Sequence, residues 1–125
     1  MATTKTGNEG EDIAAQYLEK IGMTVMDRNY RFGHEELDLV CFEPNEKNDG
    51  GEIVFVEVKT RRGRNYGEPE EAVTKAKQRH IVFAAKAYLY ERRIEGANCR
   101  FDVITVRLGD KDPEITHIRD AFWAN

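Results

Sequence analysis

The sequence predicts an α/β domain in which helices flank a mixed β-sheet. Residues 53–61 read I-V-F-V-E-V-K-T-R, a run of β-branched and aromatic residues that is typical of a buried strand. Residues 8–22 repeat apolar side chains at helical spacing, at Ile13, Tyr17 and Ile21. Further alternating segments, on both sides of a second and longer helix, give the order helix, three strands, helix, two strands. This order favours a sheet with helices packed against it.

The expected elements follow one another along residues 1–125, which we take as a single domain because no linker divides them. They are a helix at 8–22, a strand at 23–28, a turn at 29–33, strands at 36–42 and 52–59, a helix at about 70–93, strands at 99–107 and 114–118, and a short helical end, D-A-F-W. Asn8 with Glu11 resembles a capping box, and Gly22 ends the first helix. The polar segment 44–51 would join its two neighbouring strands as a hairpin.

The composition narrows the classes of protein that fit. A formal net charge of −4 excludes a uniformly basic coat for nucleic acid, although a local basic patch is compatible with it. Cys41 and Cys99 lie in apolar strand-like segments without a C-x-x-C motif, so we interpret them as reduced core residues. Nowhere do about 18 apolar residues run together, and the N-terminus has no apolar segment. We therefore expect a soluble cytoplasmic protein without membrane association.

The residues that carry chemistry lie in the most apolar strand and its neighbour. Phe55, Glu57 and Lys59 share one face of the strand, because alternate residues point the same way. Asp38 lies inside strand 36–42 and can lie beside Glu57 if the two strands pair. Two carboxylates that close repel unless a cation sits between them, and a hard divalent ion held by carboxylate and carbonyl oxygens relieves the repulsion. This arrangement is what metal-dependent phosphodiester cleavage needs.

A simpler interpretation of the same residues stays open. Glu57 and Lys59 would form a salt bridge at the end of the strand, and turn amides would satisfy Asp38. An acid-x-lysine triplet also arises by chance in a chain with 34% charged residues. The spacing alone therefore does not decide between the two interpretations.

A series of motifs covers nearly the whole chain and closely resembles the YraN-like bacterial family of predicted endonucleases. In order, the motifs are G-x-x-G-E-x-x-A-x-x-Y-L from residue 7, R-N-Y-R from 28, E-L-D-L-V from 36, V-F-V-E-V-K-T-R from 54, Y-G-x-P-x-x-A-V from 66 and R-F-D-V-I from 100. The family resembles archaeal Holliday-junction resolvases. The resemblance implies a restriction-endonuclease-like core, αβββαβ, with the PD-(D/E)xK motif.

The resemblance also implies a role for each site residue. Asp38 and Glu57 become metal ligands, with the Val58 carbonyl completing the set, and Lys59 becomes the catalytic lysine. Glu11, on the first helix, corresponds to the acid that reaches into the site in resolvases. The chain departs from many family members at Glu35, where they have glycine. An extra acid there could disfavour phosphate.

Basic residues follow the proposed catalytic strand. We expect the nucleic-acid backbone to be contacted by Arg61, Arg62, Arg64, Lys75 and Arg79. A solvated charged loop is the alternative for the arginines. Tyr66 in the same loop could stack on a base or sugar, or equally pin the loop against the sheet.

Several other candidates are assigned structural roles. The histidines at 34, 80 and 117 lack the spacing of metal ligands. Asp102 is left out of the site, because it can pair with Arg100 or cap a sheet edge. Phe122 and Trp123 are expected to pack on the core, with a homodimer contact as the alternative.

Together these features predict a Mg²⁺- or Mn²⁺-dependent endonuclease that hydrolyses phosphodiester bonds in nucleic acid, DNA rather than RNA, with branched or flapped DNA as the expected substrate. Two alternatives belong to other classes of protein. One is a non-catalytic nucleic-acid-binding module that keeps the fold, and the other is an acidic protein-interaction domain, which the negative net charge favours. The complete set of three acids and a lysine argues for the enzyme, because a pure binder has little use for buried acids that repel phosphate.

Overall fold

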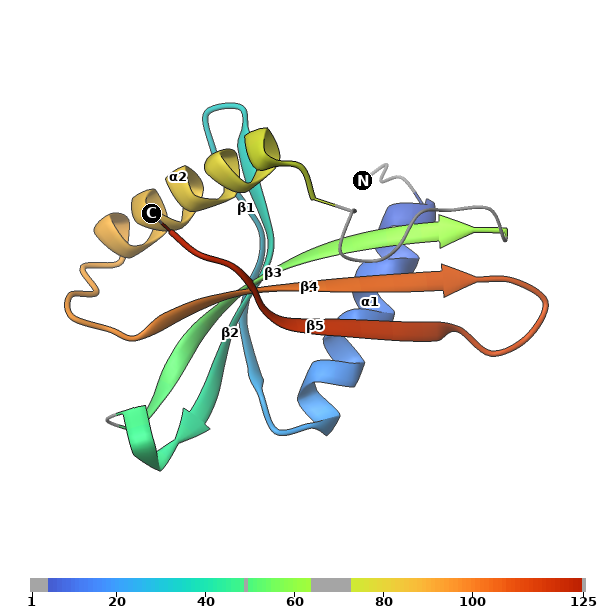
Figure 1. Cartoon of the computed structure of the whole chain (residues 1–125), viewed down its shortest axis with the longest axis horizontal. Helices are drawn as coiled ribbons and strands as arrows, with labels where there is room; N and C mark the ends of the chain where they lie inside the picture. Colours follow the sequence, from blue (N-terminus) through green and yellow to red (C-terminus); the bar gives the residue numbers. More distant parts are fainter. Residues whose placement is uncertain (1–4, 49, 64–72, 125) are drawn as a thin grey trace.

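The computed structural model describes residues 5–48, 50–63 and 73–124 of the chain (Figure 1). Its elements are α1 (Lys5–Lys20), β1 (Thr24–Phe32), β2 (Glu35–Asn45), a 3₁₀ turn (Glu46–Asn48), β3 (Gly50–Arg62), α2 (Lys75–Glu91), β4 (Cys99–Leu108) and β5 (Glu114–Phe122). The predicted order and the α/β class are confirmed. The first six principal elements have the αβββαβ order that the family resemblance implies, and β5 extends the sheet. Within the described ranges, no helix is long and apolar enough to span a membrane.

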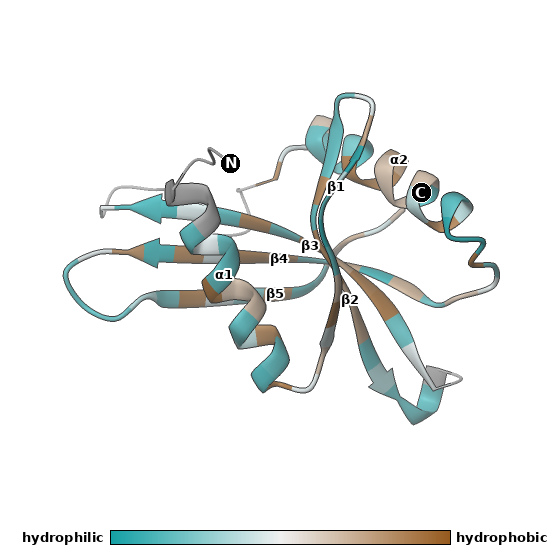
Figure 2. Ribbon diagram, turned by 180° about the vertical axis from the view of Figure 1, so that it is seen from behind, coloured by the Kyte–Doolittle hydropathy of each residue, from teal (hydrophilic) through white to brown (hydrophobic). Residues whose placement is uncertain are grey.

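The strands form one mixed sheet in the order β1-β2-β3-β4-β5, in which β3 and β4 run parallel and the other neighbours run antiparallel. A parallel pair needs a long crossover, and the chain through α2 supplies it. Figures 1 and 2 view the molecule from opposite sides and show α2 on one face of the sheet and α1 on the other. Each helix therefore covers its own hydrophobic core.

Strand β3 separates these two cores as its alternating sequence predicts. Phe55 packs in the core under α2, whereas Val54 and Val56 pack in the core under α1. All three side chains are almost fully buried, which removes apolar surface from water on both faces. Figure 2 shows hydrophobic residues along the middle of β3 and hydrophilic ones at its arrowhead. The strand is thus apolar where both faces are covered and polar where it leaves the core.

The sheet opens where β2 and β3 separate. Their pairing runs from Asn45 opposite Gly50 to Leu39 opposite Val56, and β3 then continues alongside β4 alone. Figure 1 shows the β1–β2 hairpin turning away from the direction of β3 toward α2. Leu37 packs in the core under α2 and Leu39 in the core under α1, although residues two apart in a regular strand share a face. Strand β2 therefore twists at Asp38, which lies between them.

Helix α1 approaches β3 so closely that only glycine fits at the contact. A Cβ atom on Gly10 would lie 1.9 Å from Oγ1 of Thr60, far inside van der Waals contact. Glycine at this position allows the helix backbone to lie against the strand. The next residue, Glu11, is consequently held beside the open end of the sheet.

Four expectations about the ends of elements were wrong. Helix α1 already includes Asn8, so this residue is not an N-cap. Strand β1 continues to Phe32 through the predicted turn, because its pairing with β2 resumes at Tyr30 although Asn29 adopts a left-handed conformation (φ 55°). Helix α2 begins at Lys75, since the Thr74 side chain caps it by accepting from the backbone N–H of Lys77; residues 70–72 lie outside the described residues.

The C-terminal end is the fourth difference. The segment D-A-F continues strand β5 up to Phe122 instead of forming a helix. The ring of Phe122 stacks on Phe101 of β4 with 5.1 Å between centroids, and this contact favours the extended conformation. By contrast, Gly22 follows α1 with φ +103°, as its predicted role at the helix end requires.

Candidate active site

Asp38 lies at the point where β2 and β3 separate. Its Oδ2 accepts a hydrogen bond of 2.8 Å from the backbone N–H of Val58. The side chain therefore takes the place of the backbone partner that β2 no longer offers to β3 at this position. Asp38 and Glu57 occupy the register position directly beyond the last pair, Leu39 and Val56. The sequence-based expectation that the two acids are neighbours on paired strands agrees with this geometry.

Glu57 is 5% exposed and lies between two lysines from different elements. Its Oε2 is 3.5 Å from Nζ of Lys59, two residues further along β3, and 3.9 Å from Nζ of Lys77 in the first turn of α2. The contact with Lys59 follows from alternation along the strand. The contact with Lys77 depends on how α2 packs on the sheet, so no sequence pattern placed this lysine beside the acid.

Glu11 reaches the same place from α1. Burial and the Asp38 carboxylate raise the pKa of Glu11, while a hydrogen bond with the Asn29 side chain opposes the shift. The nearest cation recorded for Glu11 among the described residues is Arg28, a guanidinium nitrogen of which lies 3.6 Å from Oε1. The Oε1 atom is buried and has no hydrogen-bond partner among the described residues. The motif R-N-Y-R, for which no role was predicted, thus contacts Glu11 through Arg28 and Asn29.

The open end of the sheet explains how both helices reach one cluster. A closed sheet would separate the α1 face from the α2 face. Where β2 leaves β3, Glu11 arrives from the α1 side and Lys77 from the α2 side. We name the resulting group the acidic fork: Glu11, Asp38, Glu57, Lys59 and Lys77.

Asp38 has the strongest electrostatic perturbation in the acidic fork. Burial, followed by the negative charge of Glu57, raises its pKa to about 7, and the N–H of Val58 only partly offsets this. A carboxyl group with this pKa is partly protonated at neutral pH. A cation bound between Asp38 and Glu57 would replace that proton and relieve the repulsion.

The donor set of the acidic fork fits a hard divalent ion. Within the described part of the chain, no group of three or more acidic, histidine or cysteine side chains could hold a metal ion by itself. Mg²⁺ needs only one or two carboxylates, because water and substrate phosphates complete its shell. Asp38 and Glu57 supply these carboxylates, whereas Oε1 of Glu11 lies 3.6 Å from a guanidinium nitrogen of Arg28. Mg²⁺ or Mn²⁺, with the Val58 carbonyl as expected from the resemblance, is the ion that this set would hold.

The predicted backbone contacts fall in two places. Arg61 and Arg62 end β3, and a guanidinium nitrogen of Arg62 lies 3.1 Å from Oε1 of Glu9. Lys75 and Arg79 lie on α2, where they line a groove. The other two predicted contacts, Arg64 and Tyr66, lie outside the described residues.

Glu35, the departure from the family pattern, does not join the acidic fork. Its Oε1 lies 3.4 Å from Nδ1 of His80 on α2. When His80 is protonated this contact is an ion pair, which reduces the repulsion that Glu35 exerts on phosphate.

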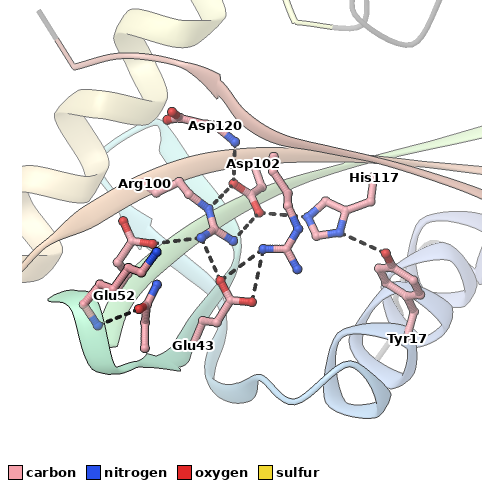
Figure 3. A network of polar contacts seen from close by, with 10 residues as sticks. Tyr17, Glu43, Glu52, Arg100, Asp102, His117 and Asp120 are labelled. Carbon is pink, nitrogen blue, oxygen red and sulfur yellow. Dashed lines mark hydrogen bonds and ion pairs between the residues drawn. The ribbon is translucent and has the colours of Figure 1, made fainter. Parts of the chain in front are cut away.

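A second polar cluster surrounds Asp102 and serves the stability of the fold (Figure 3). Asp102 is fully buried on the α1 face of the sheet, whereas Glu57 shares the α2 face with Phe55. Its carboxylate accepts two hydrogen bonds from Arg100, at 2.8 and 3.0 Å, as the sequence suggested. The backbone N–H of Asp120 donates a further bond of 2.9 Å. We call this group the Asp102 network and place it outside the candidate site.

Histidine and tyrosine extend the Asp102 network toward α1. Nε2 of His117 lies 2.8 Å from Asp102, and Nδ1 lies 3.0 Å from the Tyr17 hydroxyl. Burial alone would raise the pKa of Asp102, but its hydrogen bonds with His117, Arg100 and the Asp120 amide lower the pKa below the usual value. His117 is therefore a satisfied interior residue, as its lack of ligand spacing predicted.

Comparison with known proteins identifies the family. Residues 10–106, which include all four predicted catalytic and metal-binding side chains, match the uncharacterised protein family UPF0102. The chain belongs to UPF0102. This is the YraN family that the sequence motifs indicated, so the resemblance is confirmed.

The relatives in UPF0102 match along nearly their whole length. The UPF0102 protein of Rhodococcus opacus is 47% identical over 117 residues, covering 93% of this chain and 94% of its own. The one from Symbiobacterium thermophilum is 48% identical over 121 residues, covering 96% and 98%. The one from Syntrophotalea carbinolica is 48% identical over 116 residues, covering 93% and 89%.

Among solved structures, the UPF0102 chain is similar to Pyrococcus furiosus SfsA, described in complex with Ca²⁺. The TM-score is 0.37 and the sequence identity is 14%, covering 91% of this chain. The UPF0102 chain spans 62% of that protein.

Replacing Asp38 with asparagine is expected to stabilise the metal-free UPF0102 protein at about pH 8, by on the order of 2 kcal/mol. Because the folded-state pKa is raised to about 7 from the ordinary 3.8, the folded protein holds the proton more tightly than the unfolded chain. Wild-type stability should therefore fall as the pH rises between these two values, and asparagine removes that fall.

Urea unfolding in EDTA at about pH 5 and pH 8 measures this effect. Asp112→Asn, on the exposed loop between β4 and β5, is the matched control and should leave the pH dependence unchanged. If Asp38→Asn destabilises the protein equally at both pH values, the carboxylate makes net favourable contacts and the electrostatic description of the acidic fork is wrong.

Proposed function

We propose that this UPF0102 protein is a Mg²⁺- or Mn²⁺-dependent endonuclease that hydrolyses phosphodiester bonds in DNA. The observation that carries the proposal is the acidic fork, in which three acids from α1, β2 and β3 meet two lysines at the open end of the sheet. Burying carboxylates together costs free energy unless a cation or a chemical task compensates for it. A surface that only binds phosphate would have no use for them.

Each residue has a role in this proposal. Asp38 and Glu57, with the Val58 carbonyl, would hold the ion, which when bound supplies an activated water and neutralises charge on the phosphate. Lys59, 3.5 Å from the Glu57 carboxylate, would hold the attacking water or the scissile phosphate through its ammonium group. Glu11 has a raised pKa, so it is suited to hold or receive a proton beside the reacting groups.

One observation favours a different class of protein. The ion pair between Glu57 and Lys59 that the simpler interpretation requires is present, and a backbone N–H does satisfy Asp38. In that case the fold would serve as a non-catalytic nucleic-acid-binding module. That interpretation does not explain why a third acid, Glu11, lies close enough to Asp38 for the Asp38 carboxylate to raise its pKa.

A cleavage assay tests the proposal. The full chain is incubated with branched, flapped, single-stranded and duplex DNA of one sequence, and with an RNA counterpart, in Mg²⁺, Mn²⁺ or EDTA. We expect metal-dependent cutting of at least the branched or flapped DNA, and none by Glu57→Gln prepared in parallel. Tight binding of these substrates without cutting in either metal would instead assign the protein to the binding modules.

Whether the protein forms a homodimer determines how many strands of a DNA substrate meet an acidic fork at once. A homodimer, as the likeness of the family to resolvases suggests, would present two acidic forks to two strands. Sedimentation of the protein with and without branched DNA measures this state.

A further inference from the structure

A groove runs between α2 and the segment that follows β5. Its volume is about 770 Å³, and residues 120–124 form the wall opposite the helix. Figures 1 and 2 both show the C-terminal end of the chain beside α2. The groove thus lies next to the helix whose first turn carries Lys77 into the acidic fork.

One side of α2 lines the groove with positive charge. Lys75, Arg79 and Lys86 stand at positions that share a side of the helix, since side chains about four, seven or eleven residues apart lie above one another. Asp120 is the one acid among the described residues that line the groove. This excess of cations is local, because the whole chain carries a net charge of −4.

Aromatic side chains accompany these cations. Phe83 on α2 is 57% exposed, and Trp123 on the opposite wall is 71% exposed; such exposure is unusual for large apolar side chains. The expectation that Trp123 packs on the core is therefore wrong, whereas Phe122 does so. Phe122 is buried and stacks on Phe101, which in turn stacks on Phe55 at 5.4 Å. The floor of the groove is thus held by a row of packed rings, with Trp123 beside it.

We propose that this cationic–aromatic groove binds a single-stranded segment of nucleic acid that leads to or from the acidic fork. Cations that follow the phosphates, together with aromatic rings on which bases stack, are the two elements of single-strand recognition. Unpaired bases expose the flat faces that Phe83 and Trp123 can stack on, whereas a duplex hides those faces within its own stack. From Lys75 to Lys86 the helix extends roughly 16 Å, enough for a few nucleotides.

The groove and the acidic fork share the first turn of α2. Lys75 lines the groove while Lys77, two residues on, lies 3.9 Å from Glu57. A strand in the groove would therefore pass close to the candidate catalytic residues. This connection rests on the proposed nuclease function, but binding in the groove does not.

Trp123 is the only tryptophan of the chain, so its fluorescence reports on the groove directly. The full protein in EDTA is titrated with oligodeoxythymidine and, separately, with a duplex of equal length. We expect the single strand to quench the fluorescence and to bind more tightly than the duplex. Replacing Lys75, Arg79 and Lys86 together with alanine should weaken single-strand binding about ten-fold or more. The slope of log affinity against log salt concentration should become shallower by an amount that corresponds to about two phosphate contacts.

A matched triple variant controls for charge alone. Lys20→Ala, Lys47→Ala and Lys111→Ala remove the same charge from exposed positions away from the groove and should change the affinity less than about two-fold. Trp123→Ala, followed by the anisotropy of a labelled oligonucleotide, should weaken binding about ten-fold, and Trp123→Phe should restore most of it. Restoration by phenylalanine indicates stacking rather than a general effect on the fold.

The inference fails if the single strand does not quench Trp123, or if the two triple variants weaken binding equally. It also fails if wild-type protein self-associates and Trp123→Ala abolishes that association, because a second copy of the chain then occupies the groove. Cleavage without quenching would reject the groove and keep the nuclease. Quenching without cleavage of any substrate would reject the nuclease and support the groove.

Discussion

Replacing Lys59 with alanine is expected to reduce the single-turnover rate of DNA cleavage by about a hundred- to a thousand-fold. The Lys59 ammonium group shares the α2 face of β3 with Glu57 and lies 3.5 Å from its carboxylate. In the proposed reaction, a cation at this position would act on charge that develops at the phosphate or on the attacking water. Nucleic-acid binding should weaken only modestly, since the variant loses one phosphate contact among several.

Cleavage and binding are measured on the same preparations, with binding followed in EDTA by anisotropy. Lys77→Ala is the matched variant, because Lys77 also lies beside Glu57, at 3.9 Å, but on α2. We expect it to lose less activity than Lys59→Ala. If Lys59→Ala binds as poorly as it cuts, or cuts like the wild type, Lys59 is not the catalytic lysine.

Replacing Asp102 with alanine should cost about 3–5 kcal/mol of unfolding free energy. The carboxylate is fully buried and pairs with Arg100 and His117, so its removal leaves a buried cation and a buried imidazole without their shared partner. Arg119→Ala breaks an ion pair with Glu43 in which the arginine is about half exposed. This second variant should cost less than about 1 kcal/mol.

Urea unfolding at neutral and acidic pH measures both the size and the sign of this effect. The pKa of Asp102 is lowered in the folded protein, so its stabilising contribution is present above its ordinary value of 3.8 and is lost as the pH falls below that value. The acid-induced loss of stability should therefore be smaller in Asp102→Ala than in the wild type. A cost near that of Arg119→Ala would show that the Asp102 network contributes little.

The sequence predicted the parts of the molecule that depend on local pattern. Alternation in β3 placed Phe55, Glu57 and Lys59 on one face, and the hairpin placed Asp38 beside Glu57. Period and spacing are sufficient here, because a strand buried on both faces has no other way to arrange its side chains. The acid on α1 came from the family resemblance instead.

Features that arise from tertiary packing were not predictable in this way. Asn29 is a left-handed residue inside a strand whose pairing continues on both sides, whereas its local sequence, R-N-Y-R, is typical of a turn. Lys77 reaches Glu57 only because the Thr74 cap fixes where α2 begins. The contact of His117 with Tyr17 joins residues 100 positions apart, and no local pattern indicates such a pair.

Manganese binding tests most directly whether the acidic fork is a metal site. Isothermal titration of the full chain at neutral pH should show one Mn²⁺ per chain, with an affinity that rises with pH up to about 7, because the ion must displace the proton of Asp38. Glu57→Gln should abolish this binding, whereas Glu114→Gln, at the exposed start of β5, should leave it unchanged. Wild-type protein that binds no Mn²⁺, or Glu57→Gln that binds it with the same affinity, would contradict the account and leave the acidic fork as a structural salt bridge.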